Sequence, residues 1–123
     1  DPEFREDYRF TIETTRFYFA HREALFDGEM LNPGRMSCDA RDVKFLVRGT
    51  FAAEGEYQEF VAKALPTVLH SVWRTPDGRV GAVLVNWTRE PRDYRLQAPD
   101  IGGIREGLLP ARSWKWIDRE VGK

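Results

Sequence analysis

The clearest structural signal in this chain is the run Val68-Leu69-His70-Ser71-Val72-Trp73-Arg74-Thr75-Pro76-Asp77-Gly78-Arg79-Val80-Gly81-Ala82-Val83-Leu84-Val85-Asn86-Trp87-Thr88. Residues 68–74 and 79–88 are rich in β-branched and apolar side chains, which favour strands. The four residues between them are typical of a tight turn, since Pro suits its second position and Gly the positive φ that follows. We therefore expect a β-hairpin whose second strand, apolar on both faces, lies at the centre of a sheet.

Shorter β segments are predicted on both sides of the hairpin. The stretch 57–64 fits either a strand or a helix, and we favour a strand because Pro66 follows it and strands flank it. Downstream, a Gly-rich loop over 101–107 is expected to precede a short apolar segment, Leu108-Leu109. The remaining predicted elements are strands at 29–31, 43–51, 93–96 and 113–117, and turns at 32–34 and 52–55.

Residues 5–26 have the periodicity of one amphipathic helix, with Gly28 as a stop signal. The four residues before it resemble the remnant of a cloning site, and we exclude them from the fold. The sequence thus predicts a mainly β chain: an antiparallel β-sandwich over 28–123, preceded by one N-terminal α-helix over 5–27. The apolar stripe of the helix consists of Phe10, Phe17, His21 and Leu25, with Tyr18 and Ala24 beside it.

Length and charge exclude several classes of protein. The chain has 123 residues, which fits one domain but not a (β/α)8 barrel, which needs about 250 residues. Its formal net charge of -1 provides no attraction to nucleic acid or to an anionic membrane. No run of about 20 apolar residues predicts a membrane span. The single cysteine, Cys38, cannot form an internal disulfide, so it does not indicate a compartment.

Groups that carry chemistry are scattered along the chain. His21, His70 and Cys38 lie in separate predicted elements, so we expect neither a metal site nor a cofactor. No nucleophile motif or phosphate-binding loop is present. Asp27 and Glu29 flank Gly28 and could converge, but with 20 acidic residues such proximity is expected by chance. The sequence therefore predicts that this chain has no active site of its own.

Four tryptophans are the candidate ligand-binding residues. Trp114 and Trp116, two residues apart, share one face of the predicted last strand, and Trp73 and Trp87 are expected to be cross-strand neighbours in the hairpin. Sugars stack on exposed aromatic faces, so these four residues are candidate carbohydrate-binding groups. Packing in a core or between domains is the alternative that we favour. Asn86-Trp87-Thr88 matches the N-glycosylation pattern, but inside a strand end it would be unusable.

The hairpin and the segments around it resemble a known family. Together with Glu90-Pro91, 94–96 and Leu109-Pro110-Ala111-Arg112-Ser113, the hairpin resembles the C-terminal β-sandwich domain of amylase-like and related bacterial glycoside hydrolases. The stretch 22–31 resembles the passage from the last helix of their catalytic barrel into that sandwich. The resemblance covers about residues 16 to 117, apart from 51–65. It implies that helix 5–27 ends a barrel whose catalytic acids lie upstream.

Three functions follow for comparison. The resemblance implies a non-catalytic accessory domain that packs against the barrel of its parent enzyme. This predicts an exposed apolar patch on the helix, which could also make the excised fragment dimerise. A carbohydrate-binding module that takes up oligosaccharide would instead present exposed tryptophans. A protein-interaction domain is the third reading. The absence of a convergent nucleophile, metal or acid pair argues against an enzyme that stands alone.

Overall fold

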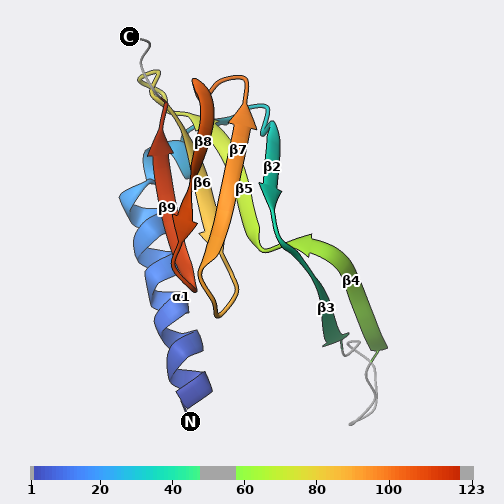
Figure 1. Cartoon of the computed structure of the whole chain (residues 1–123). Coiled ribbons are helices and arrows are strands. Elements are labelled where there is room, and N and C mark those ends of the chain that lie inside the picture. The colour runs from blue at the N-terminus through green and yellow to red at the C-terminus, as the bar shows by residue number, and fades with distance from the viewer. Residues whose placement is uncertain (1, 48–57, 120–123) are drawn as a thin grey trace.

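The computed structural model of the protein describes residues 2–47 and 58–119. A long helix, α1 (Pro2–Ala20), and a one-turn helix, α2 (Arg22–Leu25), precede nine strands in this part of the chain. The protein is mainly β with an N-terminal helix, as predicted (Figure 1). The strands are β1 (Glu29–Met30), β2 (Arg35–Cys38), β3 (Ala40–Val47), β4 (Gln58–Pro66), β5 (Val68–Arg74), β6 (Val80–Asn86), β7 (Arg92–Ala98), β8 (Gly103–Leu109) and β9 (Ser113–Asp118).

Two antiparallel sheets pack face to face and share one core. One sheet has the strand order β1-β5-β6-β9 and the other the order β2-β7-β8. Alternate residues of each strand point into the space between the sheets, where Leu84 of β6 and Leu96 of β7 are fully buried. The predicted antiparallel sandwich is thus confirmed. Its core consists of Val68, Val72, Val80, Ala82, Leu84, Tyr94, Leu96, Ala98, Ile101, Leu109 and Ile117.

The predicted hairpin forms the middle of the larger sheet. Its turn has the expected geometry: the Gly78 N–H donates to the Thr75 carbonyl (2.9 Å), and Gly78 has φ 91°. Strand β6 pairs with β5 on one side and β9 on the other, and all of its residues are buried. One of its faces lies toward the second sheet and the other toward β9's tryptophans, which explains why it is apolar throughout.

The N-terminal helix packs against the outer side of the larger sheet, along β9. The predicted single helix over 5–26 is wrong in one respect, since α1 ends at Ala20 and α2 begins after His21. The His21 N–H is shared between the Phe17 carbonyl (3.0 Å) and the Tyr18 carbonyl (3.3 Å), which marks the change in helical geometry. Residues 2–4, which the sequence led us to exclude, are helical and form the first turn of α1.

Strands β3 and β4 form a separate two-stranded ribbon, which we call the arm. It extends beyond the same end of the sandwich as the first turns of α1 (Figure 1). The strand predicted at 57–64 is confirmed, and its helical alternative is wrong. A β-bulge lies between Arg41 and Val43, where the Asp42 carboxylate accepts the N–H of Ala64 (2.8 Å). The predicted turn at 52–55 lies outside the described residues, as does the end of the strand predicted at 43–51.

The predicted Gly-rich loop at 101–107 is largely wrong, because residues 103–109 form β8. This strand pairs with β7 from Arg92↔Leu109 to Ala98↔Gly103. Gly107 lies inside the ladder, and a Cβ there would come within 2.8 Å of the Tyr94 hydroxyl. Gly107 thus allows the Tyr94 side chain to approach the strand closely and does not mark a loop. The last predicted strand is confirmed as β9.

Candidate functional site

Two of the candidate tryptophans lie between the larger sheet and α1. Trp114 stacks on Phe17, with 5.3 Å between ring centroids, and its Nε1 donates to the Thr14 hydroxyl (2.8 Å). Trp116 stacks on His21 at 5.1 Å. Both indoles are partly buried. One ring face of each tryptophan therefore contacts a residue of this same chain, Phe17 in α1 or His21 at its end, and both tryptophans hold α1 on the sheet.

The other two candidates lie at opposite ends of the hairpin. The register pairs Trp73 with Gly81 beside the turn, whereas Trp87 follows the last paired residue of β6. The prediction that they are cross-strand neighbours is therefore wrong, because Trp87 lies nine positions after Gly78 at one end of the turn and Trp73 only two positions before Thr75 at the other. The Trp73 Nε1 donates to the Ser71 hydroxyl (2.7 Å), and the Trp87 Nε1 to the Pro66 carbonyl (2.7 Å).

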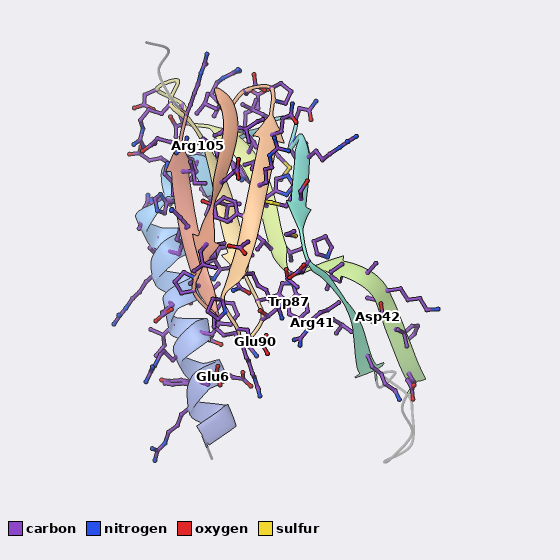
Figure 2. The ribbon with its side chains drawn as sticks, in the orientation of Figure 1. Glu6, Arg41, Asp42, Trp87, Glu90 and Arg105 are labelled. Carbon is purple, nitrogen blue, oxygen red and sulfur yellow. The ribbon has the colours of Figure 1, made fainter. Side chains whose placement is uncertain are left out.

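The four tryptophans are not brought together at one surface. Because directly paired residues share a face of a sheet, Trp73, Trp114 and Trp116 all lie on the side that α1 packs against. Trp87 lies at the end of the sandwich from which the arm leaves, near Glu90 (Figure 2).

A second apolar stripe runs along α1 on the side away from the sheet. We call it the outer stripe, and it consists of Tyr8, Ile12 and Phe19, spaced by four and seven residues. Tyr8 is 60% and Phe19 is 62% exposed. A shallow hollow covers its first half. The residues lining this hollow are Arg5, Tyr8, Arg9, Ile12, Glu13 and Arg16, so an apolar centre has a mainly cationic rim.

The first turns of α1 are tied to the end of the sandwich by charge. Arg112 lies 3.3 Å from the Asp7 carboxylate, and its guanidinium lies over the Phe10 ring, 5.2 Å from the centroid. Arg89 is 4.0 Å from Glu6 and 3.9 Å from Asp7. These contacts come from the loops after β6 and β8, so the helix is anchored to the sandwich at both of its ends.

His70 and Glu29, two of the remaining polar candidates, contact different neighbours. The His70 ring nitrogen contacts the Pro33 carbonyl (2.8 Å), and Glu29 forms an exposed ion pair with Arg74 (3.4 Å). In the described part of the chain, no three histidine, cysteine or acidic side chains are grouped so that they could hold a metal ion. None of the described helices is long and apolar enough to cross a membrane.

The Asn86 side chain is fully buried and has a structural task. Its Nδ2 donates toward the carbonyls of Glu90 (2.8 Å), Leu109 (3.2 Å) and Pro110 (3.1 Å). Its Oδ1 accepts the N–H and the hydroxyl of Thr88. Asn86 therefore joins the loop after β6 to the end of β8. Its amide, which would be the acceptor in the N-glycosylation pattern, points into the interior.

Comparisons with known proteins found no family model, no curated protein and no solved structure that matches this chain. A candidate surface for a ligand or partner therefore rests on the chain's own geometry, and the outer stripe is the one considered below. The sequence analysis missed this stripe because it described a single apolar face of the helix and assigned Tyr8, Ile12 and Phe19 to none. The spacing of Tyr8, Ile12 and Phe19 was the signal that could have revealed it.

Proposed function

We propose that this chain is a non-catalytic accessory β-sandwich domain of a glycoside hydrolase and that it packs against the catalytic barrel through the outer stripe of α1. The observation that carries the proposal is that α1 is apolar on two opposite faces. A helix on the surface of a domain ordinarily has one apolar face. The face bearing Phe17 packs against β9, whereas Tyr8 and Phe19 of the outer stripe are each more than half exposed.

The chemistry of the outer stripe indicates the kind of surface that would cover it. Tyr8 and Phe19 are largely exposed, lie on the same side of α1 about three turns apart, and are aromatic residues of the kind found at protein interfaces. Arg5, Arg9 and Arg16 beside it favour a partner with an apolar centre and acidic groups around it. The resemblance in the sequence supports a barrel as this partner, since it places the barrel's last helix at this segment.

The coding sequence upstream of Arg5 in the source gene tests the choice of partner. We expect roughly 250 residues of alternating strands and helices, in frame with this chain. An upstream region without that pattern would contradict the assignment to a glycoside hydrolase.

The role of the outer stripe is tested by Phe19→Asp, with Thr11→Asp as the matched control on another face of α1. In the parent enzyme, Phe19→Asp should lower the midpoint of thermal unfolding and expose the junction to limited proteolysis, and Thr11→Asp should not. In the isolated chain, Phe19→Asp should change the free energy of unfolding by less than about 0.5 kcal/mol, because the side chain is mostly exposed. Binding of an oligosaccharide that is lost in Trp114→Ala would instead favour a carbohydrate-binding module.

A further inference from the structure

Strand β4 forms an open edge of the arm. Among the described residues it pairs only with β3, and it lies on the side of the arm away from the sandwich (Figure 1). An edge strand presents a row of backbone N–H and C=O groups that another strand can pair with. A two-stranded ribbon is only marginally stable in water, and additional strands stabilise it. The arm therefore gains most from a partner that supplies a strand.

The charges on β4 are complementary to those of a second β4. Glu59 and Lys63 lie two residues on either side of Val61, all on one face, and all three are exposed. If two β4 strands pair antiparallel about Val61, each Glu59 lies opposite Lys63 of the second copy. The same register sets Phe60 opposite Ala62, a large side chain beside a small one. Opposite charges in directly paired positions stabilise a sheet, and like charges destabilise it.

We propose that β4 is a self-association edge, through which two copies of this chain pair antiparallel over residues 59–63. The two arms then form one four-stranded sheet with a twofold axis at Val61. Lys44 already contacts Glu59 within the arm (2.9 Å), so the dimer extends this ion pair into the row Lys44–Glu59–Lys63. The inference does not depend on the proposed function, because the outer stripe of α1 is a separate surface.

The register explains why a second copy is the partner. A shift of one residue would set Glu59 opposite Ala62, and the side chains of the two strands would no longer match face to face. With only five residues paired per copy, the interface is small, and association should be weak and concentration-dependent. The backbone edge supplies the attraction, and the two ion pairs select the partner and the register.

The test is sedimentation equilibrium of the full chain at low salt, between about 10 and 500 µM, the range suited to a weak interface. The wild type should form dimers. Glu59→Lys alone and Lys63→Glu alone should each weaken dimerisation about tenfold, because each sets like charges opposite each other at both ends. An equimolar mixture of the two variants should dimerise again, since opposite charges then face each other. The double variant Glu59→Lys/Lys63→Glu should also dimerise, which shows that the substituted arm still folds.

Glu106→Lys is the matched control, since Glu106 forms an exposed ion pair with Arg95 in the sandwich. This variant should dimerise like the wild type. The proposal is overturned if the wild type is monomeric throughout, if the single variants dimerise unchanged, or if mixing them restores nothing. A dimer abolished by Phe19→Asp and unaffected by the charge exchange would place self-association on α1 and also overturn it.

Discussion

At the scale of single residues, Asn86 links segments that are distant in sequence. It stands at the last position of β6, and it contacts the loop that follows and the end of β8. An asparagine amide has two donors and an acceptor with two lone pairs, which suits a site with several carbonyls on one side and a hydroxyl on the other. Because the Asn86 side chain is fully buried, these groups cannot form hydrogen bonds with water instead.

We predict that Asn86→Ala lowers the free energy of unfolding by about 2–4 kcal/mol, because it leaves buried backbone groups without hydrogen-bond partners. Urea unfolding followed by tryptophan fluorescence measures the loss. Asn32→Ala is the matched control, since the Asn32 side-chain Oδ1 accepts the exposed Gly34 N–H (2.9 Å) and its loss should cost less than about 1 kcal/mol. Equal losses in the two variants would contradict this role for Asn86.

His21 is the residue expected to make stability depend on pH. Burial lowers its pKa from the usual 6.5; the nearby Asp118 carboxylate opposes this shift, and the Arg79 guanidinium adds to it. The neutral ring stacks on Trp116 and contacts the Phe17 ring (4.4 Å between centroids). The folded state thus binds a proton at His21 less readily than the unfolded chain does.

The sign of the pH effect follows from that difference. The contribution of His21 is fully present above pH 6.5 and is lost as the pH falls through 6.5 toward the lower pKa of the folded state. Urea unfolding between about pH 7.5 and 5.5 should show falling stability in the wild type and a shallower fall in His21→Gln. An unchanged slope in the variant would show that His21 is not the group responsible.

At the scale of elements, the contact between α1 and the larger sheet depends on a close approach at Gly81. The Trp116 ring lies directly over Gly81, where a Cβ would overlap the indole. Because Gly81 has no side chain, the Trp116 ring can lie between the strand and the His21 ring, on which it stacks. This explains a glycine near the start of the most buried strand, where it would otherwise weaken the sheet.

We predict that Gly81→Ala costs about 1–3 kcal/mol, because the added methyl group displaces the Trp116 ring. In a Trp116→Ala background the same substitution should cost much less, since the overlapping ring is absent. Urea unfolding of the four proteins gives the coupling energy between the two sites. Additive effects would mean that the indole does not determine the cost at Gly81.

Elements with a strong local pattern were predicted from the sequence, and elements that depend on neighbours were not. The hairpin turn and β6 follow from Pro76, Gly78 and a long apolar run, which act locally. Strand β8 was mistaken for a loop, because its glycines suggest flexibility unless Tyr94 is known to lie over Gly107. The break at His21 was also missed, since apolar spacing continues across it.

At the scale of the whole molecule, the sandwich carries two projections at one end, the first turns of α1 and the arm (Figure 1). Figure 2 shows Arg41 and Asp42 where the arm leaves the sandwich, with Trp87 and Glu90 on the sandwich side. The two proposed interfaces lie on different elements, the outer stripe on α1 and the self-association edge on β4. Accordingly, Phe19→Asp and the exchange of Glu59 and Lys63 should act independently, and each proposal can fail without the other.

The order of residues along the chain was enough to establish a mainly β sandwich with an N-terminal helix, because strand and helix periodicities are local properties. Only the tertiary structure decided which faces are covered. Phe17 and Phe19 are both apolar helix residues, yet Phe17 packs on Trp114 and Phe19 is mostly exposed. Four tryptophans equally suited to sugar binding were likewise separated, three on the helix side and one at the sandwich end. Burial depends on what lies opposite a side chain, and that is determined when the sheets and the helix pack together.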